Sequence, residues 1–476
     1  MKTMVATLLF FITCSVLLGQ RLKLESYQFV SKAHDTVQAE LGSFKVLEDR
    51  TNGGSDSIQL SFIRFKSTNP KPGNPIVYLA GGPGGTGTGA AKGARFKLFM
   101  MLREVADVIA FDQRGTGISN QLPDCPCRAD FLLHQPIDKK EYVAKTTANI
   151  SKCLKFWEDK NVNLHAYNTM ESANDLEDLR KALKIDKISL WGISYGSHLA
   201  FEYIRRFEQK IDKMVLASLE GPNETIKFPK EAEDFLFNIA ELAKHNNGSE
   251  NKYPNLKHTI IEVHKRLKRK PVVTSYKNRK GTIDTVGISN FELQAAMATF
   301  YLKNPNDAKK IPYRYSQMYA GNFSEVAIDV MVIKRYIFSS IRPMSFAMDM
   351  QSGITKERQK EVERQINRTI LGSTINFLSY EWMTNLDFEQ LPDEFRKLKS
   401  NKVDALLLSG TMDGRTYVNS GKEIAEKFEN GKHVIIENGG HDLYMQSPEI
   451  GNMVVGFFKG KDVNLDRVIL EPMIFE

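Results

Sequence analysis

Lys187-Ile188-Ser189-Leu190-Trp191-Gly192-Ile193-Ser194-Tyr195-Gly196 is the most informative stretch of this 476-residue chain. The run from Lys187 to Ile193 is β-rich, and a helical pattern follows from Tyr195 to about Glu208. Between them, Gly192-x-Ser194-x-Gly196 fits a tight strand-to-helix turn whose flanking glycines relieve crowding. Such a turn lifts the serine hydroxyl above a sheet, at the positive end of the helix. The stretch therefore predicts a nucleophilic serine on an α/β scaffold.

Further strand patterns lie on both sides of this turn. Ser57 to Phe65 alternates apolar and polar residues, as a half-exposed strand does. Continuous apolar runs at Pro75 to Ala80, Val105 to Phe111 and Met214 to Leu219 indicate buried strands. A helix is expected to start at Ser172, with Asp175 as its capping partner. Strands that alternate with helices predict a mostly parallel sheet covered on both faces.

The pattern changes from about Asn223 to Ser400, where long helical runs replace buried strands. The buried-strand signature resumes at Val403 to Leu408 and Val434 to Ile436. We therefore expect a sheet domain over residues 21–222 and 401–476, interrupted by a mainly helical insertion over residues 223–400.

A serine needs a base and a residue that orients the base. Asp413 follows the strand at Val403 to Leu408, and His441 follows the strand that ends at Ile436. Both lie at the carboxyl ends of core strands, where the sites of open α/β sheets collect. The sequence thus predicts Ser194 as nucleophile, His441 as base and Asp413 as the orienting acid.

Three other residues compete for these roles with weaker support. Asp442 is adjacent to His441 and would not easily reach its ring, and Asp404 starts its strand at the wrong end of the sheet. His198, four residues after Ser194, is expected to be a packed helix residue.

Backbone donors for an oxyanion are expected from Leu79-Ala80-Gly81-Gly82-Pro83-Gly84-Gly85, which follows a core strand. We predict the N–H groups of Gly82 and Tyr195 as this pair. The alternative of a phosphate loop would need Gly-Lys-Ser/Thr, which is missing.

The first 20 residues have the pattern of a signal peptide: Lys2, an apolar run from Met4 to Leu18, and a charged stretch after Gln20. An uncleaved anchor is the rival interpretation. We expect a secreted or periplasmic protein with no stable membrane association after cleavage.

Cys125, Cys127 and Cys153 then meet an oxidising environment, and Cys153 is expected to pair with one of the other two. A zinc site is the weaker alternative, because a fourth ligand is missing.

Composition excludes little. Hydrophobic residues make up 42% of the chain and the net charge is +8, which is ordinary for a globular protein. The densest basic run, Lys265 to Lys270, is expected to be a solvated helix end rather than a nucleic-acid site. No cofactor and no nucleic-acid partner are expected.

Several motifs together resemble the prolyl aminopeptidase and tripeptidyl aminopeptidase group of α/β-hydrolases. They are Gly81-Gly82-Pro83-Gly84, Asp112-Gln113-Arg114-Gly115-Thr116-Gly117-Ile118-Ser119 and Gly192-x-Ser194-Tyr195-Gly196, with weaker matches at Ser409-Gly410-Thr411-Met412-Asp413 and Gly440-His441. The resemblance implies an α/β-hydrolase fold, a helical cap formed by the insertion, and exopeptidase activity at free amino termini. It also implies that Cys125 and Cys153 are the bridged pair.

An exopeptidase of this kind must hold a substrate ammonium group. Glu220 and Glu224 follow the strand Met214 to Leu219 where the insertion begins, and Glu381 resembles the family's acidic residue before a tryptophan. Glu220 and Glu381 are the preferred pair.

The chain departs from the family pattern at Ala80, Tyr417 and Asp442, which puts the subfamily in doubt. The expected activity is release of one to three residues from free amino termini through an acyl-enzyme. A carboxylic-ester hydrolase is the alternative, and a non-catalytic binding protein is the third interpretation.

Overall fold

The computed structural model describes residues 22–476 apart from residues 53, 246–251, 279, 338 and 377. The expected signal peptide at residues 1–20 lies outside the described residues. Ten described strands form one sheet in the order β1-β2-β3-β5-β4-β6-β7-β10-β11-β12. The first pairings, from β1 to β5, are antiparallel, and all pairings from β5 to β12 are parallel.

The strands of this sheet have the following bounds: β1 (Lys23–Val30), β2 (Thr36–Leu47), β3 (Ser57–Phe65), β4 (Ile76–Leu79), β5 (Val108–Asp112), β6 (Ile188–Ser194), β7 (Ile211–Leu219), β10 (Asp404–Gly410), β11 (Gly431–Glu437) and β12 (Arg467–Ile469). The helices that belong to the sheet region or precede β7 are α1 (Gly87–Lys92), α2 (Phe96–Leu102), α3 (Lys139–Asp159), η1 (Leu164–Ala166), α4 (Thr169–Ala182), α5 (Tyr195–Phe207), η2 (Glu208–Lys210), α15 (Val418–Ala425), η6 (Leu443–Met445) and α16 (Pro448–Phe458).

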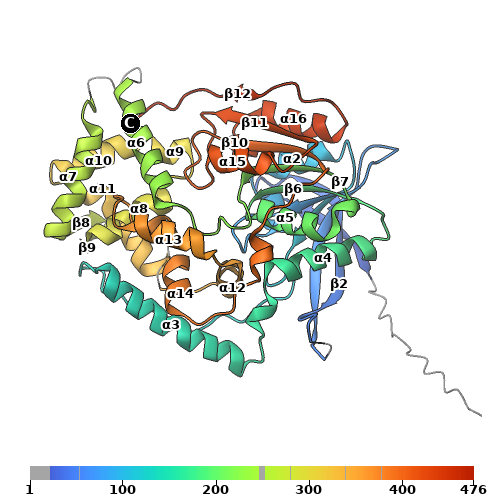
Figure 1. The fold of residues 1–476 in the computed structure, drawn as a ribbon, viewed down its shortest axis with the longest axis horizontal. Coiled ribbons are helices and arrows are strands. Elements are labelled where there is room, and N and C mark those ends of the chain that lie inside the picture. The colour runs from blue at the N-terminus through green and yellow to red at the C-terminus, as the bar shows by residue number, and fades with distance from the viewer. Residues whose placement is uncertain (1–21, 53, 246–251, 279, 338, 377) are drawn as a thin grey trace, which may run out of the picture.

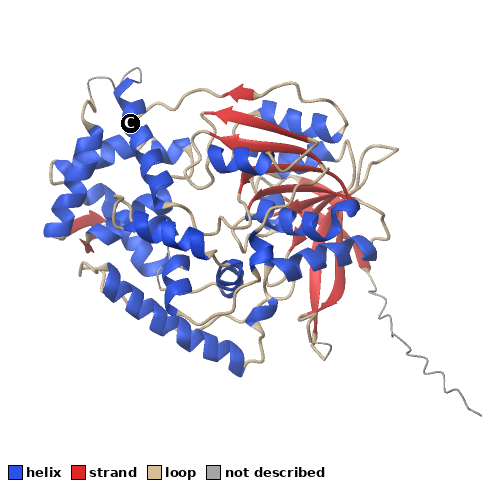
Figure 2. Cartoon of the chain, viewed as in Figure 1, coloured by secondary structure: helices blue, strands red, loops and turns tan. Residues whose placement is uncertain are grey.

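Both faces of the central parallel strands β4, β5, β6, β7 and β10 are buried, which explains their continuous apolar runs. In β7, Met214 and Leu216 pack in one core cluster, while Val215 and Ala217 pack in the other. The first cluster includes side chains of α4, α5 and α15, and the second includes side chains of α1, α2 and α16. The sheet is therefore a middle layer between two layers of helices, as Figure 2 shows.

The chain between β7 and β10 is mainly helical and lies beside the sheet region (Figure 1). It adds one antiparallel hairpin, which the sequence analysis did not expect. Its elements are α6 (Pro229–His245), α7 (Leu256–Arg269), β8 (Val272–Lys277), β9 (Ile283–Ile288), α8 (Asn290–Phe300), α9 (Pro305–Ala308), α10 (Ile311–Tyr319), α11 (Ser324–Val332), η3 (Ile333–Ile337), α12 (Pro343–Ser352), α13 (Lys356–Ile366), η4 (Thr374–Asn376), α14 (Ser379–Asn385) and η5 (Asp393–Arg396). The basic run that starts at Lys265 forms the end of α7.

Segments outside residues 223–400 also contact this helical part. Helix α3, which the expected boundaries assign to the sheet domain, lies against it, and Lys139 of α3 pairs with Glu381 of α14 at 2.9 Å. At the other end of the chain, the backbone N–H of Glu476 donates to the carbonyl of Lys309 at 3.3 Å. The spatial division thus differs from the division along the sequence.

Cys125 and Cys153 form a disulfide, and among the described cysteines Cys127 is the free thiol. This confirms the pairing that the family resemblance implied. The three sulfur atoms lie within 4.8 Å of one another, and among the described residues no other group of three metal-binding side chains is as close. Because two of these sulfurs are bonded to each other, they are not the thiolate ligands that a zinc site requires. In the described part of the chain, no helix has the length and apolar character needed to span a bilayer.

Candidate active site

Ser194 lies at the turn between β6 and α5, in a backbone conformation that side chains seldom adopt. Its φ is 56° and its ψ is −126°, and a strained turn of this kind marks a functional position. The two glycines of the motif permit close packing around it. A Cβ at Gly196 would lie 2.2 Å from the carbonyl oxygen of Leu79 in β4, so α5 can approach β4 only because residue 196 has no side chain.

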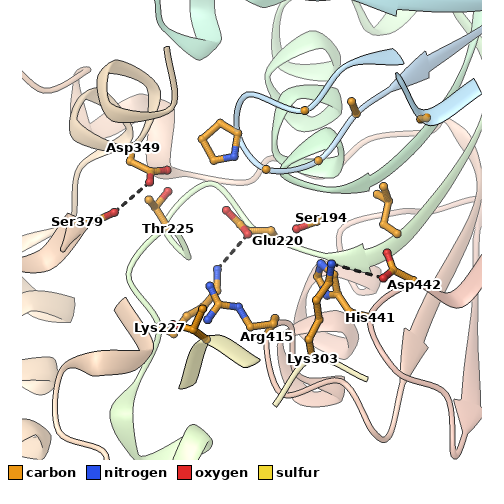
Figure 3. Close-up of a pocket in the computed structure, with 18 of the residues that line it drawn as sticks. Ser194, Glu220, Thr225, Lys227, Lys303, Asp349, Ser379, Arg415, His441 and Asp442 are labelled. Atoms are coloured by element: carbon orange, nitrogen blue, oxygen red, sulfur yellow. Dashed lines mark hydrogen bonds and ion pairs between the residues drawn. The ribbon is translucent and has the colours of Figure 1, made fainter. Parts of the chain in front are cut away.

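Ser194 and His441 both line a pocket of about 680 Å³ that lies between the sheet region and the helical part (Figure 3). His441 is held by its backbone as well as by its ring. Its N–H donates to the carbonyl of Lys303 at 2.9 Å, and its carbonyl accepts the Ser218 hydroxyl at 2.6 Å. The imidazole therefore has a fixed place on the wall of the pocket.

Asp413 accepts a hydrogen bond from Nδ1 of His441 at 2.9 Å. Its carboxylate also accepts the Thr416 hydroxyl at 2.5 Å and the backbone N–H groups of Arg415 and Thr416 at 2.8 and 3.0 Å. Burial alone would raise the pKa of Asp413, but His441 and these donors outweigh it and lower the pKa. Asp413 is thus a buried carboxylate that can orient the ring and stabilise an imidazolium.

The rival residues are engaged elsewhere. Asp442 pairs with Arg95 at 3.0 Å and with Lys303 at 3.4 Å. The ring of His198 is buried and lies 3.2 Å from the carbonyl of Gly221 and 3.2 Å from the Ser352 hydroxyl. Asp404 begins β10, at the opposite end of that strand from Asp413.

The glycine-rich loop lies directly beside Ser194. A Cβ at Gly81 would be 3.1 Å from Cβ of Ser194, and Gly82 lines the pocket. Tyr195 is the first residue of α5, where backbone N–H groups have no partner within the helix. Its phenol points away into the core, where it lies 2.9 Å from the Thr169 hydroxyl. The backbone N–H groups of Gly82 and Tyr195 therefore remain the predicted oxyanion donors.

The Asp112-Gln113-Arg114-Gly115 string supports this loop rather than lining the pocket. Asp112 accepts the backbone N–H of Thr88 at 2.9 Å and its hydroxyl at 2.6 Å, at the start of the helix that follows the loop. Arg114 is buried and donates to both oxygens of Asp175 at 2.7 and 2.8 Å. Asp175 is therefore not a helix cap: α4 begins at Thr169, and Asn168 caps it.

The structure separates the three glutamates that were predicted to bind an amino terminus. Glu220 lines the pocket and pairs with Lys227 at 3.0 Å. Burial alone would raise the pKa of Glu220, but Lys227 and His198 outweigh it and lower the pKa. Glu224 accepts the N–H of Gly221 at 2.8 Å and is not part of the pocket wall.

The prediction for Glu381 is corrected. Glu381 lies outside the Ser194 pocket and borders a different groove together with Lys139. The physical reason is that α3 covers this side of α14 and supplies a cation to Glu381. A contact between residues so far apart in the sequence could not be inferred from the neighbours of Glu381.

Sequence reasoning missed Asp349, a carboxyl that does line the pocket. It lies in α12, and Ser379 donates to it at 3.0 Å (Figure 3). Burial, together with the nearby charge of Glu220, raises the pKa of Asp349 to about 7. The available signal was an acidic residue in the otherwise apolar stretch Phe346-Ala347-Met348-Asp349-Met350.

Comparison with known proteins gives partial relatives. The chain is 32% identical over 181 residues to the serine protease Hip1 of Mycobacterium tuberculosis H37Rv, which is 37% of this chain and 34% of that protein. It is 27% identical over 178 residues to a tripeptidyl aminopeptidase of Streptomyces coelicolor, which is 35% of this chain and 32% of that protein. The chain thus spans about a third of the length of the curated relatives it matches.

Among solved structures, a proline iminopeptidase-related protein from Thermus thermophilus aligns with 92% of this chain and 98% of its own, at 16% identity and a TM-score of 0.37. The model of the alpha/beta hydrolase fold family matches residues 74–448. That match covers most of the chain and includes Ser194, Asp413 and His441. The chain therefore belongs to the α/β-hydrolase fold family.

Proposed function

We propose that this chain is a serine exopeptidase that releases one to three residues from the free amino terminus of peptides through an acyl-enzyme. The observation that carries the proposal is one pocket that holds Ser194, the Asp413-supported His441 and, beyond them, the carboxyls of the buried Glu220 and the half-buried Asp349. The partial relatives named as a serine protease and a tripeptidyl aminopeptidase support it.

In the proposed reaction, the Ser194 hydroxyl attacks the scissile carbonyl and His441 takes its proton. Asp413 holds the ring and stabilises the imidazolium, while the N–H groups of Gly82 and Tyr195 stabilise the oxyanion. His441 then protonates the leaving amine, and a water molecule, activated by the same base, hydrolyses the acyl-enzyme.

Recognition of the amino terminus is assigned to Asp349 together with Glu220. Glu220 already has an internal cation in Lys227, so the substrate ammonium group finds its uncompensated carboxyl in Asp349. In Figure 3, Glu220 lies between Ser194 and Asp349, which puts the ammonium site away from the reacting serine. A carboxylic-ester hydrolase is less well supported, because an apolar acid or alcohol group would meet these charged walls.

The proposal includes export of the protein to a compartment outside the cytoplasm. The leader-like sequence at residues 1–20 supports it, and so does the disulfide, since such bridges persist in oxidising compartments.

The test compares peptides with a free amino terminus, the same peptides acetylated, and a small neutral ester. We expect hydrolysis of the free peptides and of the small ester, and no release from the acetylated peptides. Ser194→Ala should remove labelling by a fluorophosphonate probe and lower turnover by about 10⁴-fold or more. Ser151→Ala, an exposed serine of α3, is the matched control and should be labelled like the parent.

Asp349→Asn should raise KM for free peptides more than for the ester. Equal turnover of free and acetylated peptides by the parent enzyme would contradict the exopeptidase proposal and favour the ester hydrolase.

A further inference from the structure

Most charged side chains that line the Ser194 pocket are already paired with one another. Lys227 pairs with Glu220 at 3.0 Å, and Asp442 pairs with both Arg95 and Lys303 at 3.0 and 3.4 Å. Two groups are left over: within the described residues, neither Asp349 nor Arg415 has an ion-pair partner, although both line the pocket. The wall thus offers one carboxyl and one guanidinium without a direct ion pair, although the charges of Lys227 and Arg415 act on Asp349 from a distance.

The backbone of Arg415 is held by a hydrogen bond, whereas its guanidinium makes few contacts. The backbone N–H donates to Asp413 at 2.8 Å, which places residue 415 next to the proposed catalytic acid. A guanidinium has five N–H donors, and the hydrogen bond that the structure shows from this one is to the carbonyl of Ile375 at 3.4 Å. The remaining donors are available to a ligand in the pocket.

Resting on the proposed function, we propose that Arg415 forms a subsite for a carboxylate of the substrate, so that the enzyme selects peptides with a negative group close to the cleaved bond. A guanidinium binds a carboxylate through two parallel hydrogen bonds, and such charge-assisted bonds are strong inside a partly dry pocket. A short peptide that carries both an ammonium group and a carboxylate satisfies Asp349 and Arg415 at once. A peptide that has the ammonium group but no carboxylate near the cleaved bond leaves the guanidinium without an anionic partner.

The carboxylate can belong to an Asp or Glu side chain or to the carboxyl terminus of a short peptide. Two sets of substrates distinguish these sources. In the first set, alanine peptides with a free amino terminus and an amidated carboxyl terminus carry Asp or Asn at one position, moved along the peptide. In the second set, all-alanine peptides of increasing length are compared as free acid and as amide.

The measured quantity is the ratio of kcat/KM for the acidic member of a pair to that for its neutral partner. For the parent enzyme we expect a ratio of about tenfold or more at one position or one length, the size of a charge-assisted hydrogen bond. Arg415→Met should bring this ratio close to one, and Arg415→Lys should retain part of it. Arg415→Glu should reverse the preference, towards peptides with Lys at the same position.

Arg368→Met is the matched control, because it removes an exposed arginine that does not line the pocket. This variant should keep the ratio of the parent. A parent ratio near one in every pair, or a ratio that survives in Arg415→Met, would overturn the subsite. Failure of the proposed function looks different: no free peptide, acidic or neutral, would be cleaved while the ester is still hydrolysed.

Discussion

Two carboxyls in and behind the pocket show how the environment sets the pKa of a single residue. The pKa of the buried Asp413 is lowered, while that of the half-buried Asp349 is raised to about 7. The difference lies in the donors. Asp413 has His441 and several N–H and O–H groups, whereas Asp349 has the Ser379 hydroxyl and faces the negative Glu220. Asp413 thus stays charged at neutral pH, whereas Asp349 titrates near neutral pH and a cation that enters the pocket would favour its charged form.

This difference predicts how stability depends on pH. The folded state raises the pKa of Asp349 above its unfolded value. The contribution of this group to the free energy of unfolding is therefore fully present below about pH 4, where the carboxyl is protonated in both states. It is lost as the pH rises towards about 7. Asp349→Asn has no carboxyl to ionise and does not lose this stability. The melting temperature of the variant minus that of the parent should therefore increase between about pH 4 and about pH 8. Thermal unfolding without substrate measures it. Asp130→Asn, at an exposed position, is the control, and a difference independent of pH would contradict the assignment.

At the scale of elements, the sequence located the strands from β3 to β11 in the sheet order through their alternating or continuous apolar residues, and it did not predict β1, β2 and β12 at the two edges of the sheet. Strand β3 coincides with the expected Ser57 to Phe65, and β6 differs from its expected run by one residue at each end. The start of α4 was wrong because Asn168 rather than Ser172 caps it, and Asp175 is instead the partner of Arg114. The contacts of Glu381 and Asp349 could not be foreseen, since they join segments that are distant in the chain.

The disulfide between the segment before α3 and α3 itself predicts a measurable contribution to stability. The disulfide joins residues 28 positions apart, Cys125 in an irregular segment and Cys153 in α3. Closing a loop of this length in the unfolded chain contributes roughly 3 kcal/mol. Cys153→Ser should therefore lower the free energy of unfolding by about that amount, and denatured unreduced parent protein that lacks residues 1–20, and hence Cys14, should give one free thiol. Cys127→Ser is the control and should unfold like the parent; a thiol count of three would refute the bridge.

At the scale of the whole molecule, a short segment of the helical part, residues 302–304, is hydrogen-bonded to the loops that carry the proposed catalytic residues. The carbonyl of Leu302 accepts the N–H of Gly414 at 2.8 Å, and the carbonyl of Lys303 accepts the N–H of His441 at 2.9 Å. The side chain of Asn304 accepts the N–H of Asp442 at 3.1 Å and donates to its carboxylate at 3.3 Å. The position of His441 thus depends on a part of the chain that the sequence places in the insertion.

Asn304→Ala tests this dependence. The substitution removes the two side-chain bonds and keeps the backbone contacts on either side. We expect kcat to fall about tenfold with a smaller change in KM, because a misplaced base affects the transition state more than binding. Hydrogen exchange should speed up at residues 439–442, since these loops lose part of their support. Asn430→Ala removes an exposed asparagine that bonds the Lys402 carbonyl at 2.9 Å, away from the pocket, and should leave both measurements unchanged. A parent-like kcat in Asn304→Ala, with faster exchange at the same residues, would show that the segment stabilises the loops without positioning the base.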